Sequence, residues 1–215
     1  MPPSNLNLPA PPAAALERLS ALMAAGQRVM LGLVGAPGAG KSTLAASLQA
    51  ASSHAAQVVP MDGFHLSNLE LARLGRADRK GAPDTFDAAG FAALLQRLRS
   101  QTPGEIVYAP EFHREIEEAV AGAIPLHHDT GLLIVEGNYL LLDDPQWSPV
   151  AGVLDEIWYV DVDDALRVQR LVARHQAYGR SLEAARAWVE HTDEPNARRI
   201  AACRDRADWC VRWDA

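Results

Sequence analysis

Apolar and polar positions follow one another along this chain in blocks that match two kinds of secondary structure. Short apolar runs bounded by polar residues predict buried strands at residues 29–34, 57–61, 131–137 and 156–161. Apolar residues spaced three or four apart predict amphipathic helices at residues 13–25, 43–52, 87–98, 163–178, 182–191 and 195–202. Two further runs, at residues 105–108 and 209–213, also fit strands.

Strands that alternate with helices predict a parallel sheet covered by helices on both faces, which is the α/β fold class. No repeat and no second boundary interrupts this pattern, so we expect one domain over residues 13–215. Residues 1–12 are rich in proline and predict a flexible N-terminal arm. The charge-mixed segment at residues 68–83 predicts irregular structure.

The segment between the first predicted strand and its helix fits G-x-x-x-x-G-K-[ST], the phosphate-binding P-loop. Its glycines let successive backbone N–H groups point at phosphate oxygens, and the helix N-terminus adds partial positive charge. Lys41 would reach the β- and γ-phosphates, and the Ser42 hydroxyl would bind Mg²⁺. We expect the nucleotide to contact Gly35, Ala36, Pro37, Gly38, Ala39, Gly40, Lys41, Ser42 and Thr43. The alternative is a glycine-rich turn that binds no ligand.

Composition narrows the function classes. The 215 residues carry a net charge of −7, which gives the whole chain no electrostatic footprint for nucleic acid. The longest apolar run, residues 132–142, is interrupted by Glu136 and is too short to span a bilayer. No positive charge precedes Arg18, so the N-terminus lacks the charged region of a signal peptide. We therefore expect a cytoplasmic monomer or homodimer without a nucleic-acid or membrane partner.

Two acids stand where predicted strands end, and ligands of open α/β sheets bind at such ends. Glu136 follows four apolar residues and precedes Gly137, which favours an acid that organises Mg²⁺ over one that merely terminates a strand. Asp62 follows the second strand and could accept the proton of a substrate hydroxyl. An ordinary Asp-Gly turn at Asp62 and Gly63 explains the same residues equally well.

Cations are distributed unevenly along the chain. It has only two lysines, Lys41 and Lys80, and arginine supplies the rest of its 20 basic side chains. Arg167, Arg170 and Arg174 share one face of a predicted helix, which fits either a lid that clamps ATP or a solvated basic surface. The irregular segments expected over an acceptor site carry Lys80, Asp84 and Arg114.

Together these pieces resemble the phosphoribulokinase/uridine kinase/pantothenate kinase family of P-loop kinases, and within it the bacterial nucleoside/nucleotide kinase-like or fructose transport system kinase-like proteins. The resemblance rests on residues 35–42, 61–65, 80–87, 108–114, 135–141, 170–175 and 193–196. It implies a P-loop NTPase fold of three layers, with a lid that bears arginines and with ATP and Mg²⁺ as cofactors.

The resemblance also implies roles for single residues. Asp62 matches a catalytic aspartate, Arg170 and Arg174 match lid arginines, and Asn196 matches a residue near the nucleotide base. Contacts with the acceptor would come from Phe64, His65, Lys80, Asp84, Tyr108 and Arg114. The lid lacks the closely spaced arginines of true uridine kinases, so the identity of the acceptor does not carry over.

The function predicted from the sequence is an ATP-dependent kinase. It would transfer the γ-phosphate of ATP-Mg²⁺ to a hydroxyl of a sugar, nucleoside or pantothenate-like small molecule. Asp62 would be the general base, assisted by Lys41, Arg170 and Arg174, and Ser42 and Glu136 would hold the metal. The alternative is a nucleotide-dependent regulatory or transport-accessory ATPase that has no small-molecule acceptor.

Overall fold

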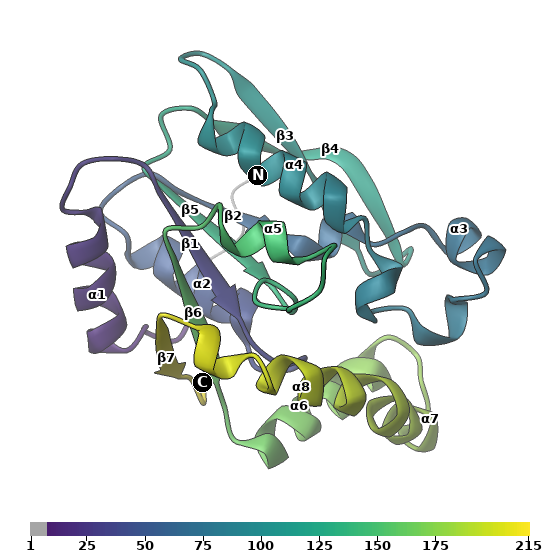
Figure 1. Cartoon of the computed structure of the whole chain (residues 1–215). Helices are drawn as coiled ribbons and strands as arrows, with labels where there is room; N and C mark the ends of the chain where they lie inside the picture. Colours follow the sequence, from purple (N-terminus) through teal and green to yellow (C-terminus); the bar gives the residue numbers. More distant parts are fainter. Residues whose placement is uncertain (1–7) are drawn as a thin grey trace.

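A five-stranded parallel sheet forms the centre of the computed structural model, which describes residues 8–215 (Figure 1). The strand order is β2-β5-β1-β6-β7, with bounds Ala56–Pro60, Leu132–Gly137, Val29–Val34, Glu156–Asp161 and Trp209–Arg212. Every pairing in this sheet is parallel, so the carboxyl ends of the strands lie at one edge. This confirms the predicted α/β class.

The apolar strands are buried on both sides because successive side chains point to opposite faces of the sheet. On β1, Leu31 and Leu33 belong to one apolar cluster, whereas Met30 and Val34 belong to the other. On β5 the same alternation places Ile134 in the first cluster and Leu133 and Val135 in the second. Two cores, one on each face, therefore hold the sheet in place.

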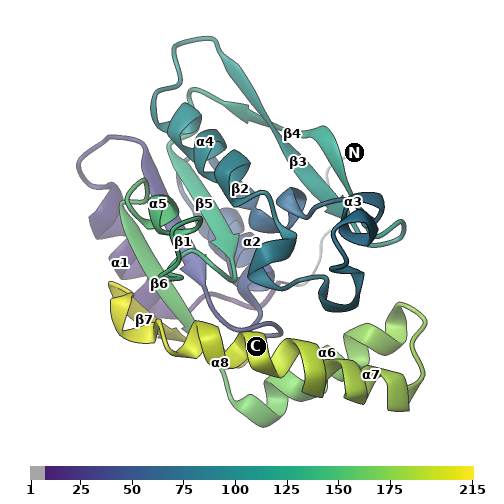
Figure 2. The same ribbon diagram turned by 45° about the vertical axis from the view of Figure 1, so that its right-hand side comes forward.

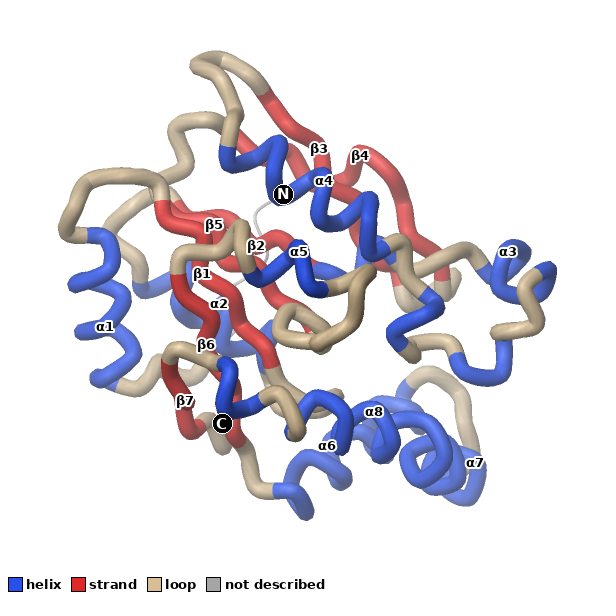
Figure 3. The backbone as a smooth tube through the Cα atoms, in the orientation of Figure 1, coloured by secondary structure: helices blue, strands red, loops and turns tan. Residues whose placement is uncertain are grey.

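Helices cover both faces, as Figures 1 and 3 show. The first face is covered by α1 (Ala13–Met23) and α2 (Lys41–Ala51), which contribute Leu19, Leu44 and Leu48 to its cluster. The second face is covered by α4 (Ala88–Arg99), α5 (Ser148–Ala151) and α8 (Glu194–Ala201). Asp87 caps α4 by accepting from Gly90 N, and Asp163 caps α6 (Asp164–Ala177) by accepting from Leu166 N.

An antiparallel hairpin is the main element that the sequence pattern did not predict. Its strands are β3 (Ile106–His113) and β4 (Glu118–His127), and it packs beside α4 (Figure 1). β3 is longer than the predicted strand at residues 105–108, and β4 was not predicted. The pattern failed because β4 is rich in alanine and glycine and has only one buried residue, Leu126.

Two other segments differ from expectation. Residues 68–83 are not wholly irregular, since they contain α3 (Asn68–Arg73) and the 3₁₀ turn Ala77–Arg79, and a second 3₁₀ turn, Pro83–Thr85, begins at their end. The helices predicted at residues 182–191 and 195–202 are joined, because α7 (Leu182–Trp188) continues through a π-helical turn, Val189–Asp193, into α8. Of the predicted N-terminal arm, residues 1–7 lie outside the described residues, and residues 8–12 form no helix or strand.

Figure 2 shows α6, α7 and α8 grouped below the sheet edge, with residues 68–85, here called the α3 segment, on the same side of the molecule. Over residues 8–215, no helix combines the length and the apolar character needed to cross a membrane.

Candidate active site

One cavity of about 760 Å³ lies at the carboxyl ends of the strands, between the P-loop, the α3 segment and the group α6–α8. The P-loop forms its floor. Gly38 and Gly40 have φ angles of 80° and 84°, values that residues with a side chain rarely adopt. A Cβ at Gly38 would lie 2.8 Å from the Arg167 carbonyl oxygen, and one at Gly40 would lie 3.0 Å from the Trp213 ring. The loop is therefore held in the curled form that presents its N–H groups.

Lys41 begins α2 and is buried against the loop that precedes it. Its Nζ donates to the carbonyl oxygens of Gly35 and Ala36 at 3.0 and 3.2 Å, and to Asn138 Oδ1 at 2.6 Å. Burial lowers the pKa of Lys41 to about 8, although the nearby carboxylates of Glu136 and Asp62 favour its charged form. A phosphate group beside this ammonium would raise the pKa again and stabilise the cation.

Ser42 and Glu136 come together from α2 and the end of β5. Ser42 Oγ donates to Glu136 Oε1 at 3.2 Å. Burial, and then the charge of Asp62, raise the pKa of Glu136 to about 7. The nearby cations therefore do not fully stabilise the ionised form of this carboxylate.

These two side chains fit a magnesium ion. Mg²⁺ prefers oxygen ligands, keeps several waters and is usually bound through one or two protein groups plus substrate phosphates. Ser42 Oγ and the Glu136 carboxylate supply that donor set, and a divalent cation would compensate the buried charge of Glu136. Among residues 8–215 no group of three His, Cys, Asp or Glu side chains could hold a metal without phosphate.

Asp62 lies in a 3₁₀ turn, Met61–Phe64, directly after β2, and its carboxylate lines the cavity. Arg114 directly follows the last residue of β3, and its Nη2 donates to Asp62 Oδ2 at 3.2 Å. The hairpin approaches this turn closely, because a Cβ at Gly63 would lie 2.2 Å from the Pro110 carbonyl oxygen. The hairpin that the sequence did not predict therefore brings Arg114 to the carboxylate.

His65 stands beside Asp62 and is held from several sides. Its Nδ1 bonds to the Asp62 carbonyl oxygen at 2.8 Å, and its ring packs 4.0 Å from the Phe86 ring and 4.6 Å from the Phe112 ring. Burial lowers the pKa of His65 below its usual value. Near neutral pH the imidazole is therefore uncharged where it lines the cavity.

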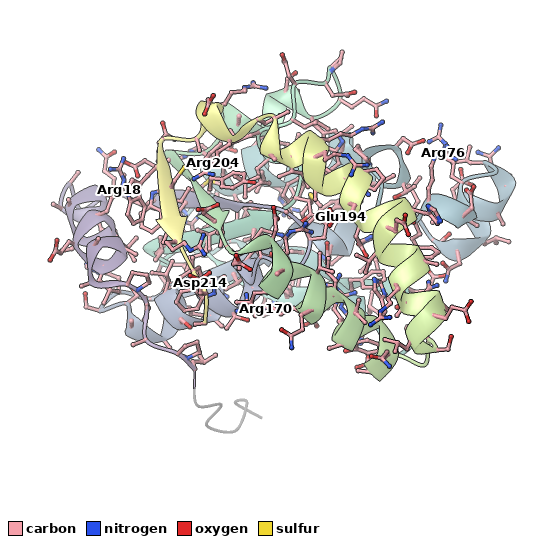
Figure 4. All side chains as sticks on the ribbon, turned by 90° about the horizontal axis from the view of Figure 1, so that it is seen from below. Arg18, Arg76, Arg170, Glu194, Arg204 and Asp214 are labelled. Atoms are coloured by element: carbon pink, nitrogen blue, oxygen red, sulfur yellow. The ribbon has the colours of Figure 1, made fainter. Side chains whose placement is uncertain are left out.

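Two arginines of the lid helix α6 line the cavity but differ in their hydrogen-bond partners. Arg170 and Arg174 line the cavity, and Arg170 Nη2 donates to the Asp214 carbonyl oxygen at 2.9 Å (Figure 4). Among residues 8–215 the Arg174 guanidinium has no hydrogen-bond or ion-pair partner, and burial together with the charge of Arg114 lowers its pKa. The half-buried Arg174 guanidinium is thus available to a phosphate.

Arg167 does not join this lid surface, contrary to the helical-face interpretation. Its side chain is only 4% exposed and donates to Glu194 Oε1 at 2.6 Å and to Asp164 Oδ1 at 3.0 Å. The i, i+3, i+7 spacing gave the correct face of the helix, but the N-terminal part of that face packs on α8. Arg167 is therefore a link between two helices.

On the lid side of the cavity, Arg180 and Trp188 had no site role predicted from the sequence, whereas residues 193–196 were expected near the nucleotide base. His175 Nε2 and Asp193 Oδ2 lie 2.8 Å apart, and the Arg180 guanidinium stacks 3.9 Å from the Trp188 ring centre. Asp193 ends the π-helical turn, a rare conformation that often marks functional sites. Asn196, predicted to contact the nucleotide, lines the same cavity.

The cavity includes most of the predicted site residues but not all. Those at its surface are Pro37, Gly38, Gly40, Lys41, Ser42, Thr43, Asp62, His65, Lys80, Arg114, Glu136, Arg170, Arg174 and Asn196. Gly35, Ala36 and Ala39 belong to the P-loop but do not line the cavity.

Three predicted acceptor contacts lie away from the cavity surface. Phe64 packs on Phe91 at a ring distance of 5.1 Å, and Tyr108 is 53% exposed on β3. Asp84 pairs with Arg79 at 2.8 Å, and this contact lowers the pKa of its carboxyl. In this arrangement Asp84 stabilises the α3 segment.

Comparisons with known proteins agree with this architecture. The sequence model of the Phosphoribulokinase / Uridine kinase family matches residues 30–213. A Schizosaccharomyces pombe protein named "Putative uridine kinase C227.14" is 39% identical over 162 residues, 71% of this chain and 68% of the relative. YggC of Escherichia coli, an uncharacterized protein, is 36% identical over 179 residues, 81% of this chain and 73% of the relative.

Solved structures are similar as well. A Silicibacter sp. TM1040 protein described as a "putative fructose transport system kinase" superposes with a TM-score of 0.79 at 39% identity, covering 91% of this chain and 98% of the other. YFH7 of Saccharomyces cerevisiae superposes with the same TM-score of 0.79 at 18% identity, covering 94% and 99%, which shows a shared fold. The chain belongs to the Phosphoribulokinase / Uridine kinase family, whose members are P-loop kinases, as its motifs predict.

Proposed function

We propose that this protein transfers the γ-phosphate of ATP-Mg²⁺ to a hydroxyl group of a small molecule, a sugar, nucleoside or pantothenate-like acceptor. The observation that supports this most directly is the position of Asp62. Its carboxylate lines the same cavity as Lys41 and Glu136, and its charge acts on the pKa of both. A carboxylate so close to the expected γ-phosphate suits a base for an acceptor hydroxyl.

In the proposed mechanism, each side chain either stabilises charge or positions a reacting group. Lys41 and the P-loop N–H groups bind the triphosphate, while Ser42 and Glu136 hold Mg²⁺, which neutralises charge on the β- and γ-phosphates. Asp62 accepts the proton of the acceptor hydroxyl and directs its oxygen at phosphorus. Arg174, which has no partner among the described residues, offsets charge that develops on the transferring group.

Asp62→Asn tests this assignment. Asparagine keeps the size of the side chain but removes its basic oxygen, so we expect kcat to fall by about 10²–10⁴-fold while ATP binding persists. ADP release would be measured with ATP-Mg²⁺ alone and then with panels of sugars, nucleosides, pantothenate and sugar phosphates. Asp143→Asn is the matched control, because Asp143 is 86% exposed away from the cavity.

Two outcomes contradict the proposal. Transfer by the Asp62→Asn protein at the wild-type rate would remove Asp62 from the chemistry. ATP turnover that no acceptor in a broad panel alters would favour the accessory ATPase instead.

A further inference from the structure

Two cations stand at the acceptor side of the cavity, on the same aromatic ring. Lys80 Nζ lies 5.1 Å and the Arg114 guanidinium 5.7 Å from the centre of the Phe112 ring. His65 packs against that ring too, and Asp62 contacts Arg114. The proposed base and both cations therefore border one small region of the cavity.

Lys80 is bonded only to uncharged oxygens. Its Nζ donates to Asn68 Oδ1 at 2.6 Å and to the carbonyl oxygen of Glu117, and among the described residues no carboxylate oxygen lies within the 4.0 Å of an ion pair. The carboxylates of Glu117 and Glu118 raise the pKa of Lys80, but the larger effect of burial lowers it. The ammonium has thus lost water without gaining a direct counterion.

Within residues 8–215 Arg114 has one counterion, Asp62, and the proposed mechanism also uses that carboxylate as the base. Its Nη2 bonds to Asp62 Oδ2, the carboxylate that would face the acceptor hydroxyl during transfer. When Asp62 accepts a hydrogen bond from that hydroxyl, the negative charge of Asp62 is shared between the hydroxyl and Arg114. Both cations on Phe112 then lack a counterion of their own.

The triphosphate has other cations available to it. Lys41 at the P-loop and Arg170 and Arg174 on α6 serve the phosphate side, where they border the P-loop floor. Lys80 and Arg114, which directly follows β3, come from other segments of the chain, although the charge of Arg114 also acts on Lys41 and Arg174.

Resting on the proposed function, we propose that the acceptor carries an anionic group, a carboxylate or a phosphate, besides its reactive hydroxyl. Lys80 and Arg114 bind this group, with Phe112 between them. An acceptor with this charge is bound with its hydroxyl toward Asp62. A neutral sugar or nucleoside leaves the two cations without a partner, so it binds more weakly.

A purely structural role for Lys80 makes a different prediction. Lys80 and Asn68 both donate to the carbonyl oxygen of Glu117, which has a φ of 52° and sits at the hairpin tip. If Lys80 only holds the hairpin tip in place, its replacement weakens the binding of neutral and anionic acceptors equally. Selectivity for charge is therefore the property to measure.

The kinetic experiment compares acceptors that share a carbon skeleton with hydroxyl groups but differ in whether they carry an anionic group. The pairs are glycerol with glycerate and with glycerol 3-phosphate, panthenol with pantothenate, and ribose with ribose 5-phosphate. We expect an anionic member to exceed its neutral partner in kcat/KM by about 10–100-fold. Lys80→Met should raise the KM for that anion by a similar factor and leave the KM for ATP unchanged, and Lys80→Arg should restore most of the loss.

Arg73→Met is the control, because Arg73 forms an exposed pair with Glu70 on α3 and does not line the cavity. A neutral acceptor that matches or exceeds its anionic partner overturns the proposal. So does a Lys80→Met protein whose KM rises equally for charged and neutral acceptors.

A binding experiment gives a result even if no acceptor is turned over. The chain has only two lysines, so lysine labelled with ¹³C at Cε gives two resolved side-chain signals, assigned with Lys80→Met. With β,γ-imido-ATP and Mg²⁺ bound, we expect glycerate, pantothenate or a sugar phosphate to shift the Lys80 signal, and the neutral partners not to shift it.

The two experiments separate the two proposals. An anion that shifts Lys80 without any acceptor-dependent ADP release supports the anion site and contradicts the kinase proposal. Acceptor-dependent ADP release with a Lys80 signal that no anion moves contradicts the anion site alone. If neither effect occurs, both proposals are wrong.

Discussion

At the residue scale, the cavity uses lysine and arginine for different geometries. Lys41 Nζ fits between two carbonyl oxygens and Asn138, a pocket that suits a compact ammonium. Arg167 instead contacts two carboxylates with two separate nitrogens, an arrangement that suits the planar guanidinium. A chain that uses arginine almost everywhere therefore has lysine at Lys41 for a physical reason.

His65 makes the pH dependence of folding testable at the same scale. Its pKa in the folded state is below its unfolded value of about 6.5, so below that pH the unfolded chain binds a proton that the folded chain resists. Stability that is fully present above pH ~6.5 is lost as the pH falls through the folded pKa.

His65→Phe should remove this part of the pH dependence, because phenylalanine keeps the stacking on Phe86 and Phe112 but does not titrate. The thermal midpoints of both proteins would be measured between neutral and mildly acidic pH. We expect the wild-type midpoint to fall more steeply on acidification. Parallel curves for the two proteins would show that His65 does not contribute.

At the element scale, Arg167 connects the lid helix α6 to α8. Its nearly buried guanidinium satisfies Glu194, which is 29% exposed. Arg167→Met leaves that carboxylate without its partner, so we expect a loss of about 1–3 kcal/mol in the free energy of unfolding. Urea titration of the two proteins measures it.

The exposed pair of Arg73 and Glu70 provides the comparison, since breaking an exposed ion pair costs about 0–1 kcal/mol. An Arg167→Met protein of unchanged stability but strongly reduced turnover would place Arg167 with the lid arginines after all.

The π-helical turn belongs to the element scale as well. Without the extra residue of this turn, α7 and α8 would form one regular helix, and Asp193 would face a different direction. Its observed position puts Asp193 against His175 on α6 at 2.8 Å. The turn therefore joins the three lid-side helices at the cavity wall.

At the scale of the whole molecule, the cavity is lined by the P-loop, the α3 segment and the group α6–α8. A ligand in this cavity therefore contacts the α3 segment and the group α6–α8 together. A ligand that binds only the folded state stabilises it by mass action. With ATP-Mg²⁺ at about one hundred times its Kd the gain is about 2.7 kcal/mol, or roughly 5–10 °C in Tm for a chain of this size.

A thermal-shift titration with ATP-Mg²⁺ checks this expectation. Lys41→Met should abolish most of the shift, because it removes the cation at the P-loop and adds no buried charge. A Tm shift in this variant equal to that of the wild-type protein would place the nucleotide elsewhere.

Much of the site was predictable because it depends on local order along the chain. The P-loop needs only a strand, a glycine-rich turn and a helix in sequence, and residues 29–51 supply them. Asp62 and Glu136 followed from apolar strands, since parallel strands bring their carboxyl ends to one edge. The roles assigned to these residues remain predictions.

Contacts between distant segments required the tertiary structure. Asn138 meets Lys41 across 97 positions, and Arg114 meets Asp62 across 52 through a hairpin with a weak apolar pattern. Arg167 shares a helical face with Arg174, yet only packing against α8 decides that it turns inward.

The sequence by itself thus determined the nucleotide half of the cavity, where each feature is local or follows from strand direction. Only the tertiary structure decided the acceptor side, where Lys80, Arg114 and Phe112 meet from two separate segments. The physical reason is that side-chain periodicity records which face is buried, but not which partner buries it.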